Sequence, residues 1–184
     1  MFRPDGAFVI ELPCYRAYAR DARRHWPHGD SGQRLVFARA AVEHLRRYRQ
    51  LRCWSREAGG QLFARFALPD IIIEKATGPR RSDWRTRHSF RPNRRAEQEE
   101  IRLQHADGLH FIGDWHTRPE RISRPSSQDQ QSVQEMFSRS SHFLNAFVLV
   151  IAGQEEFPLG LFVSLVDHST IVQISPASAS YGVE

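Results

Sequence analysis

The chain has 184 residues, of which 40% are hydrophobic and 26% charged, and its formal net charge is +5. This length predicts one domain with a core that needs no disulfide or metal to fold. The longest uncharged apolar run, residues 146–152, is too short to span a bilayer, and the first residues do not form a signal peptide, so we expect a cytoplasmic protein without membrane contact. Cys14 and Cys53 lie in unrelated contexts, which argues against a disulfide framework or a cysteine zinc site.

The first part of the chain predicts strands and one amphipathic helix. Residues 38–50 are assigned to that helix because Ala41, Val42 and Leu45 recur at helical spacing, opposite a basic face. The other segments expected here are a strand at 7–12, a basic helical segment at 15–24, a loop at 27–32 and a strand at 35–37.

The middle of the chain predicts an antiparallel hairpin, in which residues 61–67 and 71–76 flank a turn at Leu68-Pro69-Asp70. The arginine-rich segment 77–95 follows, with Trp84 and other aromatic residues interleaved. Such a segment can bind single-stranded nucleic acid or an acidic protein surface, but it is more often a solvated loop.

The rest of the chain alternates helices with strands. Residues 146–151 are apolar without a break, which indicates a strand buried on both faces. The expected helices are 94–106 and 127–139, and the expected strands are 109–113, 145–153, 159–166 and 171–174. This order indicates an α/β or α+β sheet protein.

The central strand leads to a group of polar residues. His116 and the residue at position 118 share one side of a strand end, and Asp129 lies in the first turn of the helix that follows. Three convergent positions of this kind can hold zinc with a water in the fourth place, but position 118 is an arginine. By itself, the pair Ser126 and Asp129 is more often a helix cap than part of a metal site.

The spacing H-x-R-P-x(6)-S-x-x-D from His116 to Asp129, preceded by Glu57-Ala58-Gly59-Gly60, resembles the JAMM zinc metalloproteases, also called JAB or MPN-plus. Their pattern is an upstream glutamate, then H-x-H-P, then S-x-x-D. The likeness is greatest to a bacterial branch found in integrative elements and in operons with ubiquitin-like conjugation machinery. It implies a curved mixed β-sheet flanked by helices, of the cytidine-deaminase-like architecture. The implied parts are an N-terminal extension at 1–34, a JAB/MPN domain at 35–175 and a C-terminal tail at 176–184.

The resemblance also implies a role for each matching residue. His116 and Asp129 are the expected zinc ligands, and Glu57 is the expected general base. Ser126 is expected to stabilise the oxyanion. The implied substrate is a bond after the C-terminal glycine of ubiquitin or a ubiquitin-like protein, with that protein, its conjugate and its conjugation enzymes as partners.

The departure from the family pattern is Arg118, whose guanidinium has no lone pair for a metal. It can instead pair with Asp129 or Glu57. We favour a zinc isopeptidase with weakly held metal, or with His88 or His110 as a surrogate ligand, over a pseudoenzyme that binds a ubiquitin-like protein without cleaving it. A third hypothesis, binding of nucleic acid by the arginine-rich segment, is the least favoured.

Overall fold

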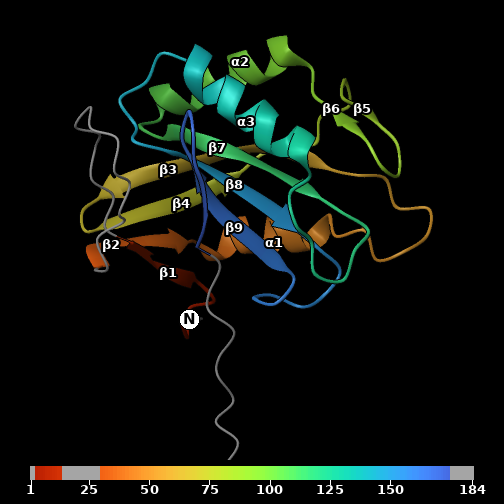
Figure 1. Ribbon diagram of the computed structural model, residues 1–184, viewed down its shortest axis with the longest axis horizontal. Helices are drawn as coiled ribbons and strands as arrows, with labels where there is room; N and C mark the ends of the chain where they lie inside the picture. Colours follow the sequence, from red (N-terminus) through yellow and green to blue (C-terminus); the bar gives the residue numbers. More distant parts are fainter. Residues whose placement is uncertain (1–2, 14–29, 175–184) are drawn as a thin grey trace, which may run out of the picture.

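A computed structural model describes residues 3–13 and 30–174, so Cys14 and the helical segment expected at 15–24 lie outside the described residues. Within these ranges, eight strands form one sheet in the order β1-β2-β4-β3-β7-β8-β9-β10. Figure 1 shows that this sheet is curved. The strands of this sheet are β1 (Phe8–Pro13), β2 (Asp30–Phe37), β3 (Gly59–Ala67), β4 (Asp70–Ala76), β7 (His110–Thr117), β8 (Phe147–Ala152), β9 (Leu161–Val166) and β10 (Ile171–Gln173). The sheet is mixed, because β2 with β4 and β7 with β8 are parallel pairs while its other neighbours are antiparallel.

Helices cover both faces of the sheet. Helix α1 (Arg39–Arg47) lies on one face, and α2 (Arg94–Ala106) and α3 (Ser127–Arg139) lie on the other (Figure 1). The predicted fold class, a curved mixed sheet flanked by helices, is confirmed. The predicted hairpin is also confirmed as the antiparallel pair β3 and β4. None of the helices within the described ranges is long and apolar enough to cross a membrane.

Three sequence-based assignments change. The central strand extends past residue 113 to Thr117, because β7 pairs with β3 on one side and β8 on the other along this length. The loop expected at 27–32 is wrong for residues 30–32, which begin β2, where Asp30 pairs with Pro13 of β1. The arginine-rich segment contains a short ribbon of β5 (Trp84–Arg85) and β6 (Phe90–Arg91).

The predicted N-terminal extension contributes to the same sheet as the rest of the chain. Strand β1 and the first residues of β2 lie before residue 35, and they pair with each other. Residues of β2 from Arg34 onward pair with β4. The division into 1–34, 35–175 and 176–184 stays a prediction.

Two apolar clusters hold the layers together. The larger one lies under α1 and includes Leu45 and Trp115, and the smaller one lies under α3 and includes Val133 and Phe147. Strand β8 contributes alternate residues to both, and all six of its residues are buried, as its unbroken apolar sequence predicted.

A bulge in β7 decides which residues face α3. The pairing of β7 with β3 shifts between Phe111 and Gly113, which leaves Ile112 without a partner on β3. Phe111 packs under α3, whereas Ile112 and Trp115 pack under α1. In a regular strand Phe111 and His116 would lie on opposite faces, because their positions differ by five, an odd number. The bulge therefore places His116 on the α3 side of the sheet.

Candidate active site

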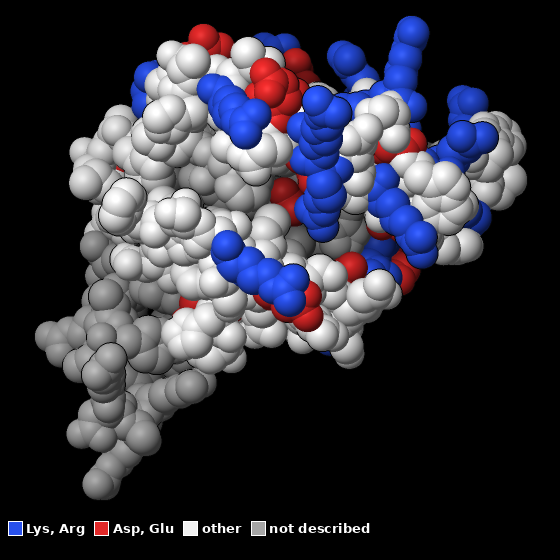
Figure 2. Space-filling view, turned by 90° about the horizontal axis from the view of Figure 1, so that it is seen from above, with Lys and Arg blue, Asp and Glu red and all other residues white. Residues whose placement is uncertain are grey.

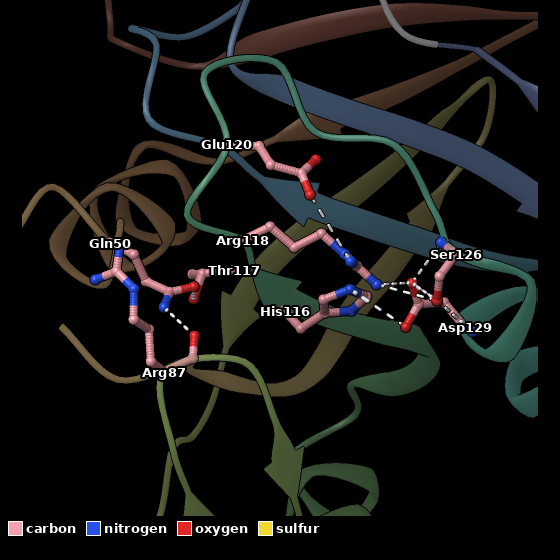
Figure 3. A network of polar contacts seen from close by, with 8 residues as sticks. All are labelled: Gln50, Arg87, His116, Thr117, Arg118, Glu120, Ser126 and Asp129. Carbon is pink, nitrogen blue, oxygen red and sulfur yellow. Dashed lines mark hydrogen bonds and ion pairs between the residues drawn. The ribbon is translucent and has the colours of Figure 1, made fainter. Parts of the chain in front are cut away.

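His116 lies near the end of β7 and points toward the start of α3. Its Nε2 atom is 3.7 Å from Oδ1 of Asp129, as Figure 3 shows. This nitrogen is buried and has no hydrogen-bond partner among the described residues. Burial lowers the pKa of His116 to about 4, with the Asp129 charge opposing this shift and the Arg118 charge adding to it. The imidazole is therefore neutral at pH 7.

Ser126 and Asp129 form a capping box at the first turn of α3. The Asp129 amide donates to Ser126 Oγ at 3.2 Å, and the Ser126 amide donates to Asp129 Oδ2 at 2.7 Å. Burial would raise the pKa of Asp129, but His116, the Ser126 hydrogen bonds and Arg118 together hold it below its usual range. Asp129 therefore caps the start of α3 and also lies beside His116.

Glu57 reaches the same pocket from the loop before β3. Its amide donates to the Thr86 carbonyl at 2.7 Å, and Arg85 Nε donates to the Glu57 carbonyl at 2.6 Å, which fixes this loop to the β5–β6 ribbon. Burial raises the pKa of Glu57 to about 7; the Arg118 and Arg85 charges oppose the shift and the Asp129 charge adds to it.

The two glycines after Glu57 permit this approach. Gly59 of β3 lies opposite His116 of β7. A Cβ atom on Gly60 would lie 1.9 Å from the Thr77 carbonyl oxygen, so only glycine fits there. The paired glycines therefore let β3 lie close to the backbone at Thr77 and to β7.

All five residues named from the sequence line one pocket with a cavity volume of about 220 Å³. They are Glu57, His116, Arg118, Ser126 and Asp129. The fold brings them together although Glu57 is far from the others in the sequence, but their catalytic and metal-binding roles remain predictions.

Arg118 occupies the centre of this group. Its Nη2 atom donates to Asp129 Oδ2 in a short contact and to Ser126 Oγ at 3.1 Å, and Nη1 lies 4.0 Å from Glu120 Oε1 (Figure 3). Of the two pairings expected for Arg118, the structure shows the one with Asp129. The guanidinium ties the expected ligand Asp129 and the expected oxyanion donor Ser126 to one permanent positive charge.

The residues present do not fit a catalytic zinc ion. The unpartnered Nε2 of His116 suits a metal ligand, and Asp129 could be a second, whereas a catalytic zinc site takes three protein ligands. Position 118 instead holds a cation, which repels the ion. Among the described residues there is no group of three or more His, Cys, Asp and Glu side chains that could hold a metal.

Neither proposed surrogate histidine completes the set. His110 lies at the other end of β7, where its ring packs against Phe66 and His105. His88 lines the pocket, yet it forms no such three-residue group with His116 and Asp129.

Sequence reasoning missed the buried polar network that holds the Glu57 loop. The amide of Ala58 donates to Thr117 Oγ1 at 2.9 Å, and Thr117 Oγ1 donates to Gln50 Oε1 at 3.1 Å. Gln50 Nε2 in turn donates to the Ser55 carbonyl at 3.2 Å. It also donates to the Arg87 carbonyl at 2.8 Å, a contact that Figure 3 draws. A glutamine just after an amphipathic helix carried no sequence signal for this role. The sequence also gave no sign that Asp114 and Glu97 line the same pocket.

Replacing Thr117 with valine is expected to lower the free energy of unfolding by about 1–3 kcal/mol, because the buried Ala58 amide and Gln50 amide group lose their partner. Urea unfolding followed by far-UV circular dichroism measures this loss. Thr117→Ser keeps the hydroxyl and serves as the matched control, with an expected loss of about 1 kcal/mol for the missing methyl group. Equal stability of the valine variant and the unaltered chain would contradict the role assigned to the network.

The comparisons with known proteins agree with this geometry. Residues 38–163 match the family described as prokaryotic homologs of the JAB domain. This chain belongs to that family. The matched range includes β3, β7 and α3 and all five pocket residues discussed above.

Two curated relatives of this JAB-domain protein are named CD-NTase/cGAS isopeptidase. The one from Vibrio cholerae is 30% identical over 131 residues, which cover 68% of this chain and 80% of the relative. The one from Pseudomonas aeruginosa is 31% identical over 147 residues, which cover 78% of this chain and 90% of the relative. The JAB-domain protein is thus related to isopeptidases, a class of hydrolases.

A solved structure is also similar to the JAB-domain protein. It is the solution structure of a protein from Desulfitobacterium hafniense, with a TM-score of 0.50 and 20% sequence identity, covering 71% of this chain and 82% of that chain. At this identity the likeness supports the fold alone.

Proposed function

We propose that this JAB-domain protein binds isopeptide-linked conjugates in the pocket around His116. We also propose that Arg118 keeps the hydrolytic centre inactive, because it occupies the position of a zinc ligand. The conjugate is the C-terminal tail of a ubiquitin-like protein joined to a lysine of a target. The names of the relatives point to a CD-NTase-like enzyme as that target. We also propose a cytoplasmic location, beside the ubiquitin-like conjugation enzymes.

One observation carries the proposal: the Arg118 guanidinium bonds to Asp129 and Ser126 inside a pocket that retains Glu57 and His116. A guanidinium stays protonated in proteins and offers no lone pair. Arg118 therefore occupies the position of the third ligand but cannot bind a metal ion. The pocket still contains the polar side chains of Glu57 and His116, which supports binding of the family's substrate there.

The size of the pocket supports a glycine-ended tail as the ligand. Its volume of about 220 Å³ is below the roughly 300–1,000 Å³ of most small-molecule sites. A narrow pocket of this kind accepts a chain that ends in glycine, since glycine has no side chain to accommodate.

A second candidate function is hydrolysis of the same bond by the unaltered chain with weakly held zinc. The neutral, unpartnered Nε2 of His116 favours it, as does the retention of Glu57 and Ser126 in the pocket. Cleavage of an isopeptide-linked probe that a chelator abolishes would establish this candidate over the first. Binding of the probe with no cleavage, at any zinc concentration, would exclude it.

Binding can be tested with a fluorescent lysine peptide that carries an extended tail ending in Gly-Gly on its ε-amino group, in the presence of a chelator. Ser132 is an exposed residue of α3 at the pocket, and Ser132→Trp is expected to fill the entrance and weaken binding by about 10-fold, a loss of about 1.4 kcal/mol. Ser138→Trp, at an exposed position further along α3 that does not line this pocket, is the matched control and is expected to bind as the unaltered chain does. Equal binding by both variants would show that the pocket is not the site.

A further inference from the structure

Exposed arginines without an acidic partner gather beside the pocket. They come from the loop before Glu57, from the turn before β5, from the β5–β6 ribbon and from the start of α2. We call this set the arginine patch: Arg52, Arg56, Arg81, Arg91 and Arg95. In the described ranges none of the five forms an ion pair, whereas other exposed arginines such as Arg39 and Arg102 do. Figure 2 shows basic side chains gathered at the right-hand end of the molecule, where Figure 1 places the ribbon.

The segment that contains the ribbon has few acidic residues. Residues 76–96 contain seven arginines and a single acidic residue, Asp83. The two carboxylate oxygens of Asp83 accept the backbone amides of Arg80 and Asn93, at 2.5 and 2.9 Å, and so hold the turn in place. The positive charge of the patch is therefore left for a partner.

Tryptophans hold two of the arginines in position. The Arg91 guanidinium lies 5.2 Å from the ring centre of Trp84, and the Arg52 guanidinium lies 5.5 Å from that of Trp54. Both indoles are exposed, at 53% for Trp84 and 71% for Trp54. Exposed tryptophan and unpaired arginine are the residue types that are enriched at the centres of protein interfaces.

The patch is built into the wall of the pocket. The end of the ribbon supplies His88, Ser89 and Phe90 to the lining. The Thr86 carbonyl, just after β5, accepts a hydrogen bond from the Glu57 amide. A partner on the patch would therefore lie next to any isopeptide bond in the pocket.

We infer that the arginine patch docks an acidic surface of the protein that carries the isopeptide bond. This inference rests on the proposed function, since it names the face of the conjugate that is held outside the pocket. A protein partner is favoured over single-stranded nucleic acid because one ring face of each exposed tryptophan is already covered by an arginine, which limits base stacking. Complementary charge also speeds association of such partners and orients them.

The test uses the full chain and a fluorescein-labelled oligoglutamate peptide as the acidic probe, with anisotropy measured at low and at moderate salt. The triple variant Arg81→Glu, Arg91→Glu and Arg95→Glu is expected to bind the peptide at least about 10-fold more weakly. The matched control Arg39→Glu, Arg102→Glu and Arg139→Glu changes the net charge equally at exposed positions outside the patch, and it is expected to lose less than about 3-fold. Binding should also quench tryptophan fluorescence, and Trp84→Phe should reduce this quench.

Three outcomes would overturn the inference. Equal losses in the two triple variants would mean that the peptide senses only net charge, and no binding at all would mean that the patch is inert. Tighter binding of an oligothymidine, lost in the patch variant, would assign the surface to nucleic acid instead. The isopeptide probe reports on the pocket and the oligoglutamate reports on the patch, so a failure of the proposed function can be told apart from a failure of this inference.

Discussion

The variant Arg118→His is expected to bind about one zinc ion per chain, whereas the unaltered chain stays well below that stoichiometry after the same equilibration. The substitution supplies a third ligand and removes a positive charge from the group that already holds His116 and Asp129. Because both ligand number and charge change in the favourable direction, we expect zinc affinity to rise by about 100-fold or more. Elemental analysis after equilibration with a small excess of zinc measures the stoichiometry.

Arg118→Ala is the control for this result, because it removes the cation without adding a ligand. It frees Asp129 and Ser126 from the guanidinium, yet it leaves two protein ligands, so its zinc content should stay closer to that of the unaltered chain. If Arg118→His cleaves the isopeptide probe and a chelator abolishes this cleavage, the pocket is a hydrolytic centre that Arg118 inactivates. If Arg118→His holds no more zinc than the unaltered chain, Arg118 is not what closes the site.

The second large effect is expected at the bulge of β7. Gly113 has φ of +150°, and a Cβ atom there would lie 1.9 Å from the Val148 carbonyl oxygen of β8. Gly113→Ala therefore adds a backbone strain and a clash with a strand that cannot move without disturbing both apolar clusters. We expect a loss of about 2–4 kcal/mol in the free energy of unfolding, measured by urea unfolding.

Gly32 provides a control that separates the two causes. It also has a positive φ, +71°, but nothing lies within 4 Å of a Cβ built on it. Gly32→Ala therefore reports the strain alone, with an expected loss of about 1 kcal/mol. If Gly113→Ala costs no more than Gly32→Ala, the close contact between β7 and β8 is not as tight as the structure has it. If Gly113→Ala stays folded, the displaced β7 should also weaken binding of the isopeptide probe, because His116 follows the bulge.

Local patterns in the sequence were enough for most elements. Helical spacing of apolar residues located α1, and the capping pair Ser126 and Asp129 located the start of α3. The unbroken apolar run of β8 predicted burial on both faces. These signals depend on residues within a few positions of one another, so they can be read without knowing which segments meet in space.

The motif also placed four of the five pocket residues within one short stretch, from His116 to Asp129. The substituted ligand was visible in the sequence because arginine cannot donate a lone pair in any fold. The fold class followed from the same motif and from the order of strands and helices.

Tertiary structure decided what depends on pairing between distant segments. The register between β3 and β7 brings Gly59 opposite His116 and so delivers Glu57 to the pocket. The bulge at Gly113 reverses which residues of β7 face α3, an outcome that no regular alternation predicts. The choice of Asp129 over Glu57 as the partner of Arg118, and the location of the arginine patch beside the pocket, followed from these placements. The sequence by itself determined the elements and the chemistry of each side chain, because these are local properties; only the packed sheet determined which side chains meet, because contact depends on strand register and on the face that each residue presents.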